Sequence, residues 1–247
     1  MPFLKKFKPC PEWRRKEQIS YKSGTRHTVY FLNGDQHVGD WRDDKREGKG
    51  AALTRGGHLY EGDFSGELRQ GHGVLSRRMA DGSLQLAYSG QWERGKRHGW
   101  GIGRDADGSW YEGCWREGRR AGEGRGWLPD GSFYHGEWLD NQFHGRGVLV
   151  QPNGNCFEGE FQCGVKHGQG RFFHLDSGQL QEGVWDQGVC VSSTLRQAES
   201  SGFTMPPNEL LNADGVAEES QQGALQRVRS KSVKSAASLG RLGTGNI

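Results

Sequence analysis

Aromatic and glycine residues alternate with polar residues in a five-residue pattern that recurs along most of the chain. The pattern is aromatic-x-Gly-x-aromatic, as in Tyr111-Glu112-Gly113-Cys114-Trp115, and a Gly-x-Gly triplet follows most copies. The copies, counting weaker ones at both ends, begin at residues 37, 60, 88, 111, 134, 157 and 181, so most steps are 23 residues. A fixed period of about 20 to 50 residues is typical of an array of identical supersecondary units.

The two-residue alternation predicts β-strands. In a strand, Tyr111, Gly113 and Trp115 share one face while Glu112 and Cys114 share the other. Asn-Gly and Asp-Gly pairs, such as Asp130-Gly131, precede most copies and predict hairpins with type I′ turns. We expect an all-β fold: an elongated, open antiparallel meander of about fourteen strands, roughly 65 Å long, with a ladder of aromatic rings on one face.

The pattern divides the chain into three parts. Residues 1–32 form a basic N-terminal segment with a capping strand, and residues 33–188 form the repeat sheet, with six full-length copies and a truncated seventh. Residues 189–247 are interpreted as a linker and a largely disordered tail, in which 213–228 could form one short helix. Asp81-Gly82 marks an insertion within the 28-residue step between residues 60 and 88.

Composition is consistent with a thin sheet in a reducing compartment. The chain has 41 Gly, 32% hydrophobic residues and a mean hydropathy of −0.86, which alone would suggest disorder, yet it has 9 Trp, 11 Phe and 6 Tyr. Its net charge of +3 does not predict nucleic-acid binding. No secretory signal or apolar run long enough to span a membrane is found, so we expect an intracellular, cytoplasmic protein.

The combination Tyr-x-Gly-x-Trp followed by Gly-x-x-x-Gly-x-Gly resembles the MORN repeat (membrane occupation and recognition nexus). The second half of the motif matches at residues 95–101 and 118–124, and the resemblance covers about residues 33–188. It implies a non-catalytic scaffold that tethers partner proteins in spermatogenic cells, the acrosome or the flagellum. The alternative that it implies is a peripheral membrane protein that binds acidic phospholipids through basic repeat loops.

Motifs for other chemistry are incomplete. Residues 90–97 mimic a phosphate-binding loop, but Arg97 stands where a Mg²⁺-binding Ser or Thr is needed. Histidines recur in successive repeats about 10 Å apart, too far to share a zinc ion; they are His72, His98, His144 and His167. We therefore expect no enzyme activity, cofactor or metal, and we interpret these histidines as surface residues.

Charge patterning is the one functional signal with specific content. Loop residues are basic and strand residues acidic, so folding should produce a basic edge beside an acidic face. The candidates for binding an acidic protein or lipid headgroups are Lys45, Arg46, Arg94, Lys96, Arg97, Arg119 and Arg120. A solvated edge that deters aggregation is the alternative interpretation.

Two further interactions are expected. Ser230 and Ser232 each follow an arginine by three residues, which predicts phosphorylation by basophilic kinases, with plain disorder as the alternative. Exposed edge strands and rows of aromatic residues suit self-association or strand addition by a partner protein.

Overall fold

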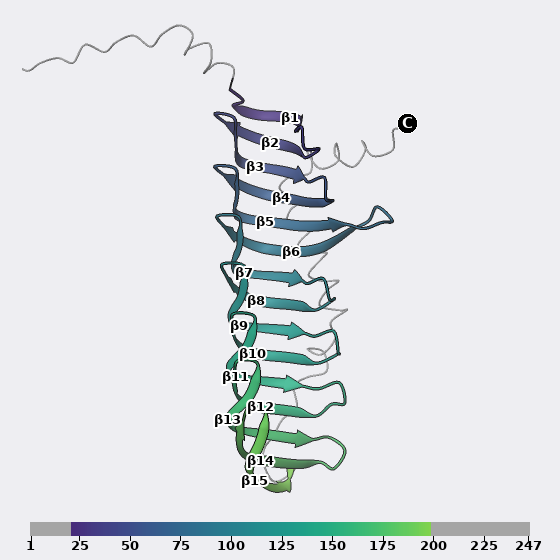
Figure 1. The fold of residues 1–247 in the computed structure, drawn as a ribbon, viewed down its shortest axis with the longest axis vertical. Coiled ribbons are helices and arrows are strands. Elements are labelled where there is room, and N and C mark those ends of the chain that lie inside the picture. Colours follow the sequence, from purple (N-terminus) through teal and green to yellow (C-terminus); the bar gives the residue numbers. More distant parts are fainter. Residues whose placement is uncertain (1–20, 199–247) are drawn as a thin grey trace, which may run out of the picture.

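The computed structural model describes residues 21–198, and it arranges them as one 15-stranded antiparallel sheet in which sequence neighbours are neighbours in space (Figure 1). This confirms the predicted all-β open meander. The strands are β1 (Gly24–Tyr30), β2 (Gln36–Arg42), β3 (Lys45–Leu53), β4 (His58–Ser65), β5 (Leu68–Arg78), β6 (Leu84–Glu93), β7 (Lys96–Arg104), β8 (Trp110–Arg116), β9 (Arg119–Trp127), β10 (Phe133–Leu139), β11 (Gln142–Val150), β12 (Cys156–Gln162), β13 (Val165–His174), β14 (Gln179–Asp186) and β15 (Val189–Gln197).

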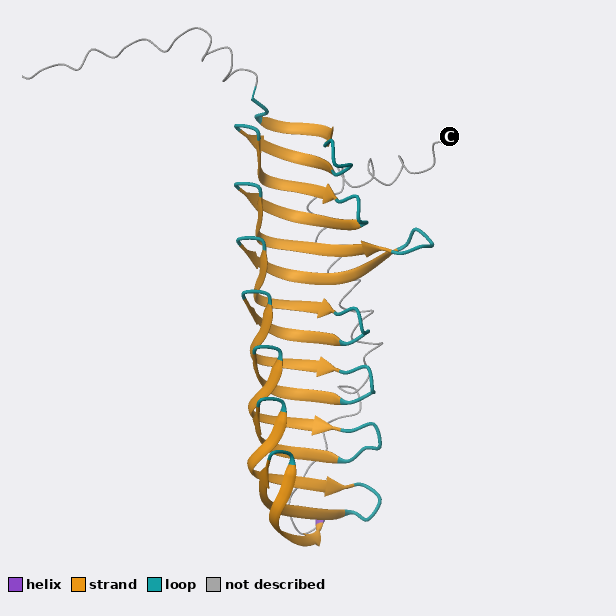
Figure 2. Ribbon diagram, viewed as in Figure 1, coloured by secondary structure: helices purple, strands orange, loops and turns teal. Residues whose placement is uncertain are grey.

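Each repeat is one hairpin (Figure 2). The five-residue pattern lies on the even-numbered strands from β2 to β14, and the Gly-x-Gly triplet lies on the strand that follows. The sheet continues past residue 188 as β15, where a linker was expected from the sequence. β15 lacks the aromatic pattern. Most of its side chains are exposed, and the strand pairs with β14 through its backbone.

The type I′ turns lie at the other end of the strands from the Asp-Gly pairs, where the sequence predicted them. The tight turns after the aromatic pattern are of type I′, because both central residues have positive φ, as at Glu117 (52°) and Gly118 (86°). In the Asp-Gly turns only the glycine has positive φ, as at Gly131 (86°). There the Asp130 carboxylate accepts a 2.9 Å hydrogen bond from the backbone N–H of Ser132, so the aspartate acts through an Asx turn.

The glycines form a platform for the aromatic rings. The first glycine of each triplet has positive φ, as at Gly122 (71°), beside a bulge in the ladder. The second lies opposite the glycine of the aromatic pattern, as Gly124 lies opposite Gly113. A Cβ added to Gly124 would lie 2.3 Å from the hydroxyl oxygen of Tyr111, so only glycine leaves room for this ring.

The rings form one continuous ladder. Tyr88 meets Trp92 of its own strand at a centroid distance of 5.0 Å and Trp115 of the next repeat at 5.4 Å, both edge to face. Such pairs contribute about 0.5–1.5 kcal/mol each beyond burial. Trp115 also donates from its indole Nε1 to the carbonyl oxygen of Gly101 at 3.1 Å. Each repeat therefore depends on its neighbour for its core.

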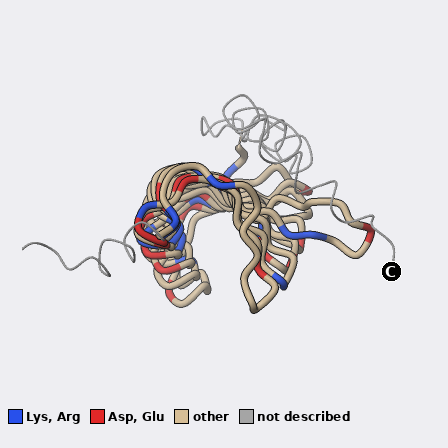
Figure 3. The backbone as a smooth tube through the Cα atoms, turned by 90° about the horizontal axis from the view of Figure 1, so that it is seen from above, with Lys and Arg blue, Asp and Glu red and all other residues tan. Residues whose placement is uncertain are grey.

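The sheet curves around this ladder. Arg97 lies near the start of β7 and Asp105 directly follows its end, yet their side chains approach to 3.6 Å. Eight residues of flat strand would separate their Cα atoms by about 26 Å. The strand must therefore bend, and seen along the ribbon both rows of turns bend to the same side (Figure 3). The aromatic rings of the pattern fill the inner face. The outer face carries the polar positions of the strands and a second, smaller buried cluster of Trp127, Phe133, Val150 and Cys156.

Candidate binding surfaces

A column of cations covers the aromatic ladder. Nine residues after the start of the pattern, most repeats carry a basic side chain that lies over one or two rings. These residues are Arg46, Arg69, Arg97, Arg120 and Lys166. Arg97, for example, lies 5.2 Å from the ring of Tyr88 and 4.9 Å from that of Trp115. Burial lowers the pKa of Arg69 and of Lys166, which fits their position over the rings on the inner face of the curved sheet.

Three of the predicted binding residues belong to this column. Arg46 pairs with Glu67 at 2.9 Å, while Arg97 and Arg120 both pair with the carboxylate of Asp105. The side chain of Arg120 is only 12% exposed. These cations therefore stabilise the inner face, and little of their charge is presented to a partner. Arg69 was not among the predicted binding residues, although its fixed offset of nine residues was a usable signal.

The other four candidates lie exposed at the edge of tight turns. Lys96 pairs with Glu117, whose pKa is lowered by that hydrogen bond, and Arg119 pairs with Asp140 at 3.1 Å. Lys45 and Arg94 form no ion pair within residues 21–198. Carboxylates thus interleave with the cations, and this edge is not uniformly basic. The predicted phosphorylation sites, Ser230 and Ser232, lie outside the described residues.

The outer face is rich in carboxylates. Some form cross-strand ion pairs, such as Glu112 with Arg125 at 3.0 Å and Glu158 with Arg171 at 2.7 Å. Over β9 to β14 the face has a trough of about 950 Å³. Five carboxylates and two guanidinium groups line it, together with glycine backbone; the charged residues are Glu123, Glu137, Glu158, Glu160, Glu182, Arg146 and Arg171.

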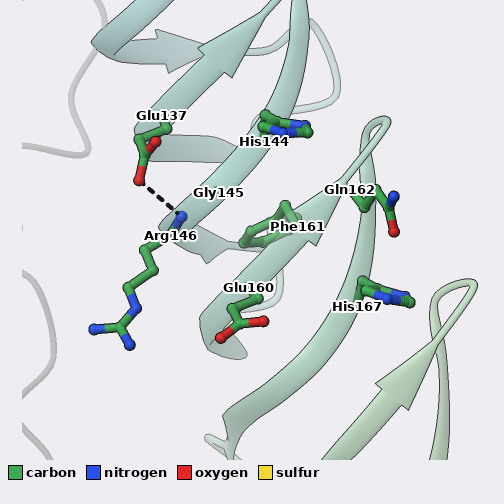
Figure 4. Close-up of a pocket in the computed structure, with 8 residues that line it drawn as sticks. All are labelled: Glu137, His144, Gly145, Arg146, Glu160, Phe161, Gln162 and His167. Atoms are coloured by element: carbon green, nitrogen blue, oxygen red, sulfur yellow. Dashed lines mark hydrogen bonds between the residues drawn. The ribbon is translucent and has the colours of Figure 1, made fainter.

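A smaller hollow of about 340 Å³ adjoins this trough. Figure 4 shows acidic and basic side chains on one side of it and imidazoles on the other; the labelled residues include Glu137, Arg146, Glu160, His144 and His167. The Glu137 carboxylate accepts a hydrogen bond from the backbone N–H of Arg146 at 3.2 Å. Within residues 21–198 no group of three or more His, Cys, Asp or Glu side chains is arranged to hold a metal ion.

Comparison with known proteins decides the family. The model of the MORN repeat matches residues 37–51, 60–79, 88–109, 111–133, 134–156 and 157–173. MORN repeat-containing protein 3 of Xenopus laevis is 49% identical over 231 residues, covering 90% of this chain and 97% of the relative. The chain belongs to the MORN-repeat family.

Other relatives extend the comparison. MORN repeat-containing protein 3 of Mus musculus is 48% identical over 217 residues, covering 85% of this chain and 90% of that protein. Human Alsin is 34% identical over 68 residues, which is 28% of this chain and 4% of Alsin. The MORN matches begin in β2 and end in β13, so β1, β14 and β15 flank the matched repeats. Within the described part of the chain, no helix is long and apolar enough to cross a membrane.

Proposed function

We propose that this MORN-repeat protein is a non-catalytic scaffold that holds partner proteins along a rigid ribbon. One observation carries the proposal: the inner face of the sheet is filled by its own aromatic and cationic side chains. On the sheet formed by residues 21–198, other molecules can therefore meet only the outer face and the edges. MORN repeats are generally non-catalytic, and both hollows described above are open surface features without a converging nucleophile and base.

An exposed aromatic residue gives the outer face a suitable anchor. Trp100 is 50% exposed, and it lies opposite Cys114 on the next strand. Tryptophan is enriched among residues that dominate binding energy at protein interfaces. The half-exposed ring surrounded by polar positions favours a protein partner over a small ligand.

The phospholipid alternative has weaker support. It requires a row of available cations, but five of the seven candidate residues pair with carboxylates. Each unpaired basic residue near an acidic membrane contributes only about 1 kcal/mol. Lys45 and Arg94 are separated by two hairpins, so they do not form a cluster.

We test the scaffold role with the full chain as bait in an extract of spermatogenic cells, the setting that the family resemblance suggests. Trp100→Ala should lose at least part of the captured protein set at about 150 mM NaCl, where exposed charges are well screened. Leu68→Ala, which shortens a 49% exposed side chain on the tight-turn edge, is the matched control and should retain it.

Flotation with vesicles of phosphatidylserine and phosphatidylinositol bisphosphate tests the alternative. The scaffold proposal predicts no flotation at physiological salt. Two results together would favour the peripheral membrane protein over the scaffold. The wild type would float with the vesicles while the double variant Lys45→Glu with Arg94→Glu would not, and no partner protein would be captured. Immunofluorescence in testis tests the cellular setting. If the protein is absent from germ cells, the proposed location in the acrosome or the flagellum is wrong.

A further inference from the structure

The trough on the outer face has an excess of negative charge. Five carboxylates and two guanidinium groups line it, and a third guanidinium, that of Arg196, pairs with Glu182, so an excess of two negative charges remains, although the whole chain has a net charge of +3. Glu123, Glu137 and Glu160 are exposed. At one end Val184 is 42% exposed, which adds an apolar contact. The trough therefore suits an extended segment that alternates basic and apolar side chains.

The chain contains such a segment beyond the described residues. Residues 221–247 have five basic side chains and no aspartate or glutamate; the basic residues are Arg227, Arg229, Lys231, Lys234 and Arg241. Aliphatic residues are interspersed among them, including Val228 and Val233. The basic side chains of this segment thus complement the carboxylates of the trough, and its aliphatic side chains suit the apolar contact at Val184.

The connection is long enough. The described chain ends at Ala198, whose backbone N–H donates to the carbonyl oxygen of Gly178 beside β15. From there to Arg227 the chain has 29 residues, which can span up to about 95 Å. The trough extends over six strands, about 24 Å from the first to the last. Any position in it is within reach.

We propose that the acidic trough on the outer face binds the basic segment 221–247 of the same chain. Binding within one chain is favoured because the connection keeps the segment at a high effective concentration. The segment then covers the part of the outer face near β9 to β14 and competes there with partner proteins.

The same charges make the contact switchable. Phosphorylation of Ser230 and Ser232 would add about −1.5 to −2 at each position. Two phosphates would thus cancel most of the five positive charges on the segment. Phosphorylation should release the segment and expose the trough.

The test uses the full chain with the photo-crosslinker benzoylphenylalanine in place of Val233. Crosslinked peptides are identified by mass spectrometry in an equal mixture of light-nitrogen and heavy-nitrogen chains. The trough variant combines Glu123→Gln, Glu137→Gln and Glu160→Gln. The matched control combines Glu117→Gln, Asp140→Asn and Asp186→Asn, which neutralises three carboxylates on the tight-turn edge whose side chains are 62%, 67% and 63% exposed.

We expect crosslinks to β9–β14 within single chains. Their yield should fall several-fold in the trough variant, in chains phosphorylated at Ser230 and Ser232, and on raising NaCl from about 50 to about 300 mM. The control variant should keep the wild-type yield. Light–heavy products would show that the occupant is a second copy and overturn the proposal. An equal yield in the trough variant, or no crosslink to the trough at low salt, would also overturn it.

Discussion

The first repeat contains a buried histidine that should limit its stability. His37 stands where the next four repeats carry tyrosine. Each tyrosine donates from its hydroxyl to a carbonyl oxygen three residues later, as Tyr60 does to Asp63 at 2.9 Å. His37 is fully buried, and neither of its ring nitrogens has a hydrogen-bond partner. We predict that His37→Tyr stabilises the N-terminal end of the ribbon.

The size of the effect follows from the lost and gained hydrogen bonds. A buried polar group without a partner costs about 1–3 kcal/mol, and a new hydrogen bond contributes about 1 kcal/mol. The tyrosine ring has a place to lie, because Gly50 lies beneath His37 as Gly73 lies beneath Tyr60. We expect the opening free energy of β2 and β3 to rise by about 2–4 kcal/mol.

The histidine also makes this repeat sensitive to acid. Burial, with a smaller contribution from Arg46, lowers the pKa of His37 from 6.5 to about 4, while Glu67 and Asp40 oppose the change. Below pH 6.5 the opened state takes up a proton that the closed state does not. The opening free energy of this repeat is therefore highest above pH 6.5, and it falls by up to about 3 kcal/mol as the pH approaches 4. His37→Tyr and His37→Phe should both remove this dependence.

Amide hydrogen exchange measured by mass spectrometry separates the two effects. Peptides from β2 and β3 are followed at pH values of about 5 and about 7, after correction for intrinsic exchange, with β10 and β11 as the internal reference. His37→Phe removes the unpaired nitrogens but adds no hydroxyl, so it should fall between wild type and His37→Tyr. If His37→Tyr exchanges as fast as wild type, or keeps its acid sensitivity, then the unpaired imidazole does not limit this repeat.

Three further predictions concern packed positions of the sheet. Gly124→Ala should lower the free energy of unfolding in urea by about 1–3 kcal/mol, because its Cβ overlaps a tyrosine hydroxyl, whereas Gly56→Ala, whose Cβ has its nearest neighbour at 3.7 Å, should change it little. Arg69→Met keeps an apolar stem but removes the charge over two rings, so urea unfolding should show a loss of about 0.5–2 kcal/mol. Burial raises the pKa of the Cys156 thiol to about 12, so iodoacetamide at neutral pH should label exposed Cys163 and leave Cys156 unmodified until the chain unfolds, as read by mass spectrometry.

The aromatic ladder could be predicted because a two-residue period fixes which side chains share a face. The face of the sheet on which each cation lies could not be predicted from the clustering of cations in loops. Lys96 and Arg97 are adjacent, but in the strand register Lys96 lies opposite Glu93 on the outer face and Arg97 lies opposite Trp92 on the inner face. Continuing the two-residue alternation of side chains from β6 through the turn into β7 would have placed Lys96 and Arg97 on opposite faces.

The curvature was not predictable from strand alternation. It depends on bulges at glycines with positive φ, such as Gly99 (59°), and the sequence pattern marks these positions only as a Gly-x-Gly triplet. The Asp-Gly turns were misjudged for a related reason. Asp107 and Ser109 form a local hydrogen bond that stabilises a wider turn, so the pair Asp107-Gly108 does not form a type I′ hairpin.

The insertion in the second repeat shows which parts of the ribbon can vary. Residues 79–83 form a loop that projects from the edge between β5 and β6 (Figure 1). Across the insertion, Tyr60 still meets Trp92 at 5.3 Å, against 5.4 Å between Tyr88 and Trp115 where no insertion occurs. Extra residues at this edge therefore leave the inner ladder unchanged. Because neighbouring repeats interact through the ladder, the ribbon can keep its rigidity while the outer face and this edge differ between relatives, and partner specificity should reside in those two regions.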